Sequence, residues 1–287
     1  MFKRFAALLV LLTLVTSALA DPSMSYRRLL PLEGGSNFRD MGGYITTDGQ
    51  RVRRGLLFRS AAMAALTAQD MLYLDEFGFK TVVDLRTKEE IQLFPNHWAE
   101  SRGVHYITND YSFTTMMKGA ADEERKAPDM ATVYPRLLTS IAPQMKQYFS
   151  AALRDETPMV VNCSAGQDRT GVTAAIMLTL LGVPKQVVVE DYLLSTDFRR
   201  PDIENSGVDL QQAAKTNAFA AMMLQYQKAM PNASRPNPLV TAEGLPYLQY
   251  VFDQITKDYG TVEVFASKVL GLSAGDITKL RTIYLDS

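Results

Sequence analysis

The chain has 287 residues, of which 30 are Lys or Arg and 31 are Asp or Glu, so its formal net charge is −1. This near neutrality excludes the strong basic bias of proteins that bind nucleic acid or anionic membrane surfaces. Cys163 is the single cysteine, which excludes an internal disulfide, so stability must come from a hydrophobic core.

The first twenty residues have the pattern of a secretory signal peptide. After a basic start, an apolar run extends from Phe5 to Val15, and the segment ends in Ala18-Leu19-Ala20. The run is shorter than the roughly 20 apolar residues that a membrane span needs. We therefore predict that 1–20 are cleaved and that 21–287 form a single domain, secreted or periplasmic, with no integral membrane segment. An uncleaved anchor or an N-terminal core helix is the alternative.

Two strands separated by a glycine-rich turn are predicted at the start of the mature chain. Arg27 to Leu32 is the first strand, and Gly55 to Ser60 is the second and ends in a polar pair that includes Arg59. The turn spans Glu33 to Tyr44. Because its glycines can adopt positive φ, we expect it to have a structural role.

A helix and a buried strand are predicted next. Thr67 and Asp70 form a capping box that begins the helix. The run from Lys80 to Arg86 is apolar until it emerges at Asp84, which predicts a buried strand. Charged residues at the carboxyl ends of parallel strands face the ligand crevice, so Asp84 is a candidate substrate-binding residue. An ion pair that supports the neighbouring loop is the alternative.

A long irregular segment follows a further predicted strand over 104–108. Periodicity is lost from Ser112 onward, and residues 112–131 are predicted to form a lid that carries Met116 and Met117. A mobile surface loop without function is the alternative. One helix is expected from about Thr132 to Leu153.

The next segment carries the strongest indication of chemistry. An apolar run from Met159 predicts a strand, and Val172 to Leu181 predicts a helix that begins near Arg169. The intervening loop reads Cys163-Ser164-Ala165-Gly166-Gln167-Asp168-Arg169-Thr170. Backbone N–H groups of such a loop, together with the helix N-terminus, form an anion site. The planar fork of Arg169 suits two phosphoryl oxygens, and the positive field favours the Cys163 thiolate.

In this arrangement the Cys163 thiolate would lie beneath a bound phosphate as a nucleophile. The hydroxyl of Thr170 is expected to donate a hydrogen bond to the sulfur. A buried structural cysteine is the alternative interpretation.

The segment from Cys163 to Thr170 resembles the C-x5-R-[ST] loop of cysteine-dependent protein tyrosine phosphatases. Its Gly-x-Asp-Arg centre is similar to that of bacterial atypical tyrosine and dual-specificity phosphatases, some of which also act on phosphoinositides. Further segments resemble the same family from about residue 30 to 285; they are Asn37 to Tyr44, Gly55 to Ser60, Val82 to Arg86, Tyr259 to Glu263 and Val269 to Ser273. Asn162 stands where the family usually has His, and Gln167 where it often has Lys.

The resemblance implies an α/β, protein tyrosine phosphatase-like fold, in which helices flank a central, mostly parallel sheet and insertions form helical lids. It also implies a substrate site. Its candidates are Ser164, Ala165, Gly166, Gln167, Thr170, Arg59 and Asp84.

The chain beyond the loop is predicted to be mostly helical. Lys185 to Ser195 and Val208 to Met230 are expected to be helices, with a polar loop from Arg199 to Gly207 between them. Residues 200–243 are therefore a second candidate lid. A capping box formed by Ser273 and Asp276 begins the last helix.

The expected reaction is two-step hydrolysis of a phosphomonoester. Cys163 attacks phosphorus, Arg169 and the loop amides bind the equatorial oxygens, and a carboxylic acid protonates the leaving oxygen. The Trp-Pro-Asp loop that supplies this acid in many relatives is absent, because Trp98 is followed by Ala99. The atypical subgroup carries an aspartate within the loop, which makes Asp168 the first candidate; Asp110 and Asp84 are the others.

The expected partners are phosphorylated proteins, because Gln167 lacks the positive charge that would favour a polyanionic phospholipid. Phosphotyrosine is the preferred substrate and phosphoserine or phosphothreonine a secondary one. A phosphoinositide or inositol phosphate phosphatase, a non-catalytic phosphate-binding protein and a rhodanese-like protein remain as alternatives. We expect no metal or organic cofactor, and His97 and His105 are interpreted as structural or surface residues. The oligomeric state is not predicted.

Overall fold

The computed structural model describes residues 27–117, 129–229 and 236–286. The predicted signal peptide, residues 118–128 of the first predicted lid and residues 230–235 of the second lie outside this part of the chain. The described strands are β1 (Arg39–Asp40), β2 (Arg51–Val52), β3 (Leu57–Ser60), β4 (Thr81–Asp84), β5 (His105–Ile107), β6 (Met159–Asn162) and β7 (Leu285–Asp286).

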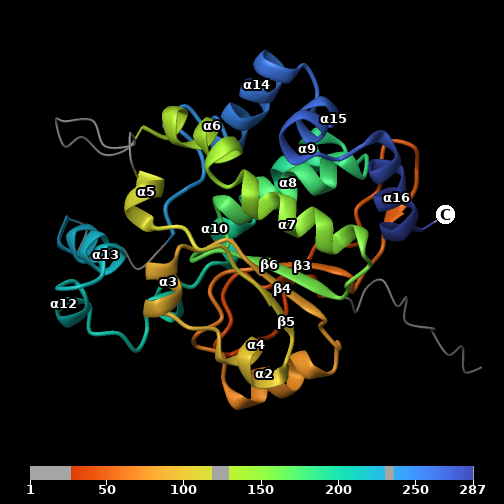
Figure 1. Ribbon diagram of the computed structural model, residues 1–287. Coiled ribbons are helices and arrows are strands. Elements are labelled where there is room, and N and C mark those ends of the chain that lie inside the picture. Colours follow the sequence, from red (N-terminus) through yellow and green to blue (C-terminus); the bar gives the residue numbers. More distant parts are fainter. Residues whose placement is uncertain (1–26, 118–128, 230–235, 287) are drawn as a thin grey trace, which may run out of the picture.

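Helices make up most of the rest of the described residues (Figure 1). They are α2 (Ala68–Asp75), α3 (Lys88–Leu93), α4 (His97–Arg102), α5 (Phe113–Met117), α6 (Met130–Ser140), α7 (Ala142–Leu153), α8 (Arg169–Leu180), α9 (Lys185–Leu193), α10 (Ser195–Phe198), α11 (Pro201–Glu204), α12 (Leu210–Ala213), α13 (Ala218–Ala229), α14 (Tyr247–Tyr259), α15 (Val262–Phe265), the π-helix η1 (Ala266–Leu270) and α16 (Ala274–Tyr284).

A five-stranded sheet in the order β1-β3-β6-β4-β5 forms the centre of the molecule. The strands β3, β6, β4 and β5 are parallel, and only β1 runs antiparallel to its neighbour. Asn162 at the end of β6 pairs with Ser60 on one side and Asp84 on the other. The segments that follow β3, β4 and β6 therefore leave the sheet side by side.

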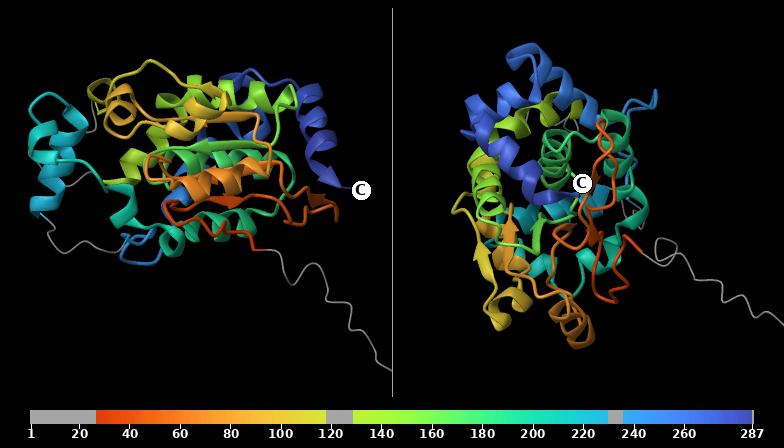
Figure 2. Two further views of the ribbon diagram at one scale, coloured as in Figure 1. Left: turned by 90° about the horizontal axis from the view of Figure 1, so that it is seen from below. Right: turned by 90° about the vertical axis from the view of Figure 1, so that its right-hand side faces the viewer.

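The two faces of the sheet bury different helices. Leu57, Val83 and Val161 point toward the larger core, which α7 and α8 cover. Their immediate neighbours in sequence point the other way, because side chains alternate along a strand. These include Phe58 and Val160, which pack with Leu74 of α2 and Trp98 of α4. Figure 2 shows the helices on both sides of the sheet, so the predicted α/β class is confirmed.

Capping boxes begin the helices at three places. The side chain of Thr67 accepts from the backbone N–H of Asp70 at the start of α2, and Ser273 and Asp276 do the same for α16, as predicted. A third box, formed by Thr87 and Glu90, begins α3. Each box satisfies backbone donors that the first helical turn leaves without partners.

Several predicted elements differ in the structure. Arg27 to Leu32 is not a strand, because only Leu29 forms an isolated bridge, to Arg39. The helix predicted over 132–153 is divided at Ile141 into α6 and α7, with a proline in the first turn of α7. The segment from Arg199 to Gly207 contains the short helix α11. The single helix predicted from Val208 is divided into two, α12 and α13, between Leu210 and Ala229.

The two predicted lid segments meet at one end of the molecule. Phe113 of α5 and Phe219 of α13 are in edge-to-face contact, with ring centroids 5.4 Å apart. Both pack with Phe94 in a small apolar cluster beside α3. The side chain of Asn217 also donates to the carbonyl of Glu89, at 2.8 Å. In Figures 1 and 2, α12 and α13 lie at the end opposite β7, next to α3 and α5. In the part of the chain that the structure describes, no helix combines the length and apolar character of a membrane span.

Candidate active site

The loop between β6 and α8 has its carbonyl groups bound from one side. Cys163 begins the loop and is only 2% exposed. The carbonyl of Ser164 accepts from the backbone of Ala62 at 3.1 Å, and that of Ala165 from the side chain of Asn37 at 3.1 Å. The carbonyl of Gly166 accepts from Asn37 and from Arg59, each at 2.9 Å.

The backbone N–H groups of this loop lack acceptors. Within the three described stretches, no N–H from Ser164 to Asp168 donates a hydrogen bond to protein. Carbonyl groups held on one side leave the amide groups for the other side, which is the arrangement of an anion-binding nest. The helix α8 begins at Arg169 and adds the positive end of its dipole.

Gly166 is required by this path of the backbone. Its φ is +64°, and a Cβ atom added there would lie 2.5 Å from the carbonyl carbon and oxygen of Ser60. A side chain would therefore collide with the backbone at the end of β3 and would also be strained in its own conformation. The loop can lie this close to β3 only because residue 166 is glycine.

A buried network of charged groups holds Asn37 and Arg59 against the loop. Asp191 of α9 accepts from Arg59 at 2.7 Å and from Arg39 at 3.2 Å. Arg39 in turn donates to the side-chain oxygen of Asn37, so all four side chains are joined. Burial raises the pKa of Asp191, but Arg39 and Arg59 outweigh burial and hold it well below its usual range. Burial, together with Arg59, lowers the pKa of Arg39 to about 10, although Asp191 opposes this effect.

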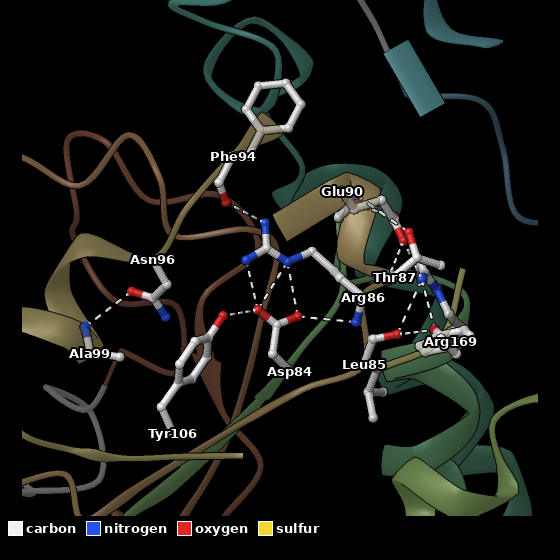
Figure 3. A network of polar contacts seen from close by, with 12 residues as sticks. Asp84, Leu85, Arg86, Thr87, Glu90, Phe94, Asn96, Ala99, Tyr106 and Arg169 are labelled. Carbon is white, nitrogen blue, oxygen red and sulfur yellow. Dashed lines mark hydrogen bonds and ion pairs between the residues drawn. The ribbon is translucent and has the colours of Figure 1, made fainter. Parts of the chain in front are cut away.

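Arg169 is fixed by a carboxylate that lies behind it. Its Nη2 is 2.5 Å from Oε1 of Glu90 and its Nη1 is 2.7 Å from Oε2, so the pair is bidentate. Nη1 also donates to the carbonyl of Leu85 at 3.1 Å and to the hydroxyl of Tyr111 at 3.3 Å. Figure 3 shows Arg169 pointing toward Glu90 and Leu85. Within the described chain the Nε–H group has no acceptor, so this edge of the guanidinium is available to an oxyanion.

Glu90 also fixes the loop and its own helix. Its carboxylate accepts from the hydroxyl of Ser164 at 2.5 Å and from the backbone N–H of Thr87 at 2.8 Å. Burial raises the pKa of Glu90, but the charge and hydrogen bonds of Arg169 outweigh burial and lower the pKa to about 2. The glutamate is therefore ionised at neutral pH and compensates the buried guanidinium.

Asp84 lies behind the site rather than within it. It is 1% exposed, and Arg86 binds it through Nε at 2.9 Å and Nη2 at 2.6 Å. The hydroxyl of Tyr106 also donates to Asp84, at 2.7 Å, as Figure 3 shows. Arg86 reaches the carbonyl of Phe94 at 2.7 Å, so the pair anchors the segment between β4 and α4. This geometry agrees with the supporting ion pair rather than with contact to a substrate.

Asp168 is placed on the surface of the loop by two donors. It precedes α8, and its Oδ1 accepts from the hydroxyl of Tyr134 and from Nε2 of Gln167, the latter at 3.2 Å. Gln167 in turn accepts from Nη1 of Arg199 at 2.6 Å. Arg199 is also paired with Glu204, at 2.6 Å. Asp110, an alternative acid, is exposed and follows β5.

The side chains of Thr170 and Asn162 form no hydrogen bond with the sulfur of Cys163. The hydroxyl of Thr170 and both polar atoms of the Asn162 side chain are buried and have no hydrogen-bond partner in the described part of the chain. The hydrogen bond predicted from Thr170 to Cys163 is therefore absent from this structure. Arg59 is brought to the loop, but it is 1% exposed and binds the carbonyl of Gly166 from behind.

The side chains that hold the loop were not predicted from the sequence. Asn37 binds the loop carbonyls, Asp191 holds Arg59, Glu90 holds Arg169, and Tyr134 holds Asp168. Two of them carried a signal: Asn37 begins a segment that resembles the family, and Thr87-x-x-Glu90 reads as a capping box. That pattern indicates the start of a helix, but it does not reveal the second partner of the glutamate 79 residues away.

Comparison with known proteins finds similarity along most of the chain. A model described as "Tyrosine phosphatase family" matches residues 30–286. A Cupriavidus necator protein named "Putative tyrosine-protein phosphatase" is 27% identical over 289 residues, with coverage of 94% of this chain and 93% of that protein. The "Triple specificity protein phosphatase PtpB" of Mycobacterium tuberculosis is 25% identical over 288 residues, with coverage of 88% and 98%. The solved catalytic core of Siw14 has a TM-score of 0.32 and 13% identity, and the match covers 68% of this chain and 97% of that core.

Proposed function

This chain belongs to the tyrosine phosphatase family, and we propose that it hydrolyses phosphotyrosine in proteins, with phosphoserine and phosphothreonine as secondary substrates. One observation carries the proposal. Three consecutive carbonyls, from Ser164 to Gly166, are bound from behind, while the neighbouring N–H groups have no acceptor within the described residues. Because Cys163 begins this nest and Arg169 ends it, the loop suits a tetrahedral dianion above a nucleophile.

The proposed chemistry has two steps. In the first, the Cys163 thiolate forms an S–P bond as the P–O bond to the leaving group breaks, and Asp168 gives its proton to the leaving oxygen. In the second, ionised Asp168 takes a proton from water, whose oxygen displaces the sulfur and releases phosphate. Arg169 and the loop amides bind the equatorial oxygens in both steps.

Hydrolysis of p-nitrophenyl phosphate, in the presence of a metal chelator, tests this proposal. The wild-type protein should turn over, whereas Cys163→Ser should lose turnover and still bind inorganic phosphate, because the amides and Arg169 remain. Thermal unfolding of both proteins shows whether the variant is folded. Undiminished hydrolysis by Cys163→Ser would overturn the mechanism.

Phosphoinositides are the second candidate substrate class. Arg199 supports it, because its guanidinium contacts Gln167 and brings a positive charge to the rim of the loop. Its pairing with Glu204 offsets part of that charge, so we retain phosphotyrosine as the first candidate. The ratio of kcat/KM for a phosphotyrosine peptide to that for a phosphoinositide decides between them. A ratio below one would favour the phospholipid.

We further propose that the protein is exported and that residues 21–287 form the mature phosphatase domain. The support is the sequence alone, a short apolar run that ends in Ala18-Leu19-Ala20. N-terminal sequencing of protein from the periplasm or medium should begin at Asp21. Recovery of a cytoplasmic protein that retains Met1 would contradict this proposal.

A further inference from the structure

Asp168 lies at the end of a chain of two buried tyrosines. Tyr134 on α6 donates to Oδ1 of Asp168, and the hydroxyl oxygens of Tyr134 and Tyr192 on α9 are 2.5 Å apart. Both tyrosines are at most 1% exposed. These hydrogen bonds therefore join the residue that precedes α8 to two other helices, and solvent does not reach the phenols.

The direction of both hydrogen bonds follows from the protons available. A phenol has one proton, and a carboxylate oxygen only accepts, so Tyr134 must donate to Asp168. The oxygen of Tyr134 must then accept from Tyr192. Burial, and next the charge of Asp168, raise the pKa of both tyrosines well above its usual value. Both phenols therefore keep their protons and remain donors at neutral pH.

This arrangement distinguishes the two oxygens of Asp168. Oδ1 accepts from Tyr134 and from Gln167, whereas Oδ2 accepts no hydrogen bond from any residue that the structure describes. A proton on Oδ1 would face two donors, so the acidic proton must be on Oδ2. We propose that Tyr134, oriented by Tyr192, is a positioning residue that confines the proton of Asp168 to Oδ2 and so directs it to the leaving group. This inference rests on the proposed role of Asp168 as the general acid.

Packing holds the two phenols in this orientation. The rings of Tyr134 and Tyr192 are in edge-to-face contact, with centroids 6.2 Å apart and planes at 87°. Tyr247 also packs against Tyr134, with centroids 5.5 Å apart. Tyr192 also lies over Gly171 of α8, where an added Cβ would be 2.9 Å from Cδ2 of the ring. These contacts restrict the rotation of both rings.

The dependence of the rate on the leaving group tests this inference. Phenolate needs a proton to leave much more than p-nitrophenolate does, so a misplaced acid slows phenyl phosphate hydrolysis selectively. We expect Tyr134→Phe to lower kcat/KM for phenyl phosphate about tenfold more than kcat/KM for p-nitrophenyl phosphate, as part of the acid contribution of roughly 10²–10⁴. Tyr192→Phe should also lower kcat/KM for phenyl phosphate more than kcat/KM for p-nitrophenyl phosphate, but by a smaller factor.

Tyr148→Phe is the matched control. Tyr148 is as buried as Tyr134, and its hydroxyl has no hydrogen-bond partner among the described residues. Its loss should leave the ratio of the two rates unchanged. In an Asp168→Asn background, Tyr134→Phe should add nothing further to the leaving-group dependence, because the proton that it positions is already absent.

The outcomes separate this inference from the proposed function. Equal losses on both esters in Tyr134→Phe, as for a structural defect, would overturn the positioning role. If thermal unfolding shows that Tyr134→Phe is not folded, the ratio measured with Tyr192→Phe decides in the same way. Absence of any Cys163-dependent hydrolysis by the wild-type protein would instead overturn the proposed function on which the inference rests.

Discussion

Glu90→Gln removes the charge that compensates the buried guanidinium of Arg169 and keeps nearly the same shape. Both side chains are buried, and the carboxylate contacts Arg169, Ser164 and the backbone of Thr87. Removal of one partner from such a pair leaves an uncompensated charge inside the protein, which costs about 3–5 kcal/mol. We expect the variant to lose a comparable part of its free energy of unfolding at pH 7.

The pH dependence of stability gives a second value for the contribution of Glu90 to the free energy of unfolding. The pKa of Glu90 is lowered from 4.5 to about 2 in the folded protein. A difference of 2.5 in pKa, at 1.36 kcal/mol for each pKa unit, corresponds to about 3 kcal/mol. Because the folded-state pKa is the lower one, this stabilisation is complete above pH 4.5 and is lost as the pH falls through 2. Between pH 7 and pH 3 the loss should be about 2 kcal/mol.

Urea unfolding of wild type and Glu90→Gln between pH 7 and pH 3 measures this effect. The difference in free energy of unfolding between the two proteins should shrink by about 2 kcal/mol as the pH falls. Glu76→Gln, at an exposed position after α2, is the control. The difference in free energy of unfolding between wild type and this variant should change little between pH 7 and pH 3. A wild-type advantage over Glu90→Gln that is independent of pH would refute the assigned ion pair.

Three further substitutions test the loop. In urea unfolding, Gly166→Ala should lower the free energy of unfolding by about 2–4 kcal/mol, because the added Cβ collides with the backbone of Ser60. Gly55→Ala is the control: its φ is also positive, but no atom lies within 4 Å of the added Cβ, so it should cost only about 1 kcal/mol. Arg169→Lys keeps the charge but loses the fork, so kcat/KM for p-nitrophenyl phosphate should fall about 100-fold or more. Gln167→Lys should raise kcat/KM for a phosphoinositide roughly tenfold relative to a phosphotyrosine peptide; an equal change for both would contradict the charge argument.

Local patterns in the sequence predicted the elements that local interactions determine. Thr67 and Asp70 are three residues apart, so their mutual hydrogen bonds need no information from elsewhere. The strand before Cys163 and the helix after it were likewise recognisable from hydrophobic periodicity. The helix expected over 132–153 is two helices that meet at Ile141. Hydrophobic periodicity does not reveal a change of direction between two consecutive amphipathic helices.

The supports of the loop depend on contacts between distant parts of the chain. Asp191 binds Arg39 and Arg59 over 152 and 132 residues, and the loop carbonyl of Gly166 meets Asn37 over 129 residues. The family resemblance marked the segment that contains Asn37 without assigning it a partner. A polar residue such as Asn37 within a motif indicates a hydrogen bond at that position, but only the folded structure shows that its partners are the carbonyls of Ala165 and Gly166.

The electrostatic field around Gln167 depends on a residue that is distant in the sequence. Position 167 carries no charge, and from the sequence this appeared to remove one cation from the loop. In the structure, Arg199 donates to the side chain of Gln167, so a guanidinium lies beside the uncharged position. Glu204 binds the other side of that guanidinium and offsets its charge. The field that a second phosphate would meet at the loop therefore depends on the balance between Arg199 and Glu204 as well as on residue 167.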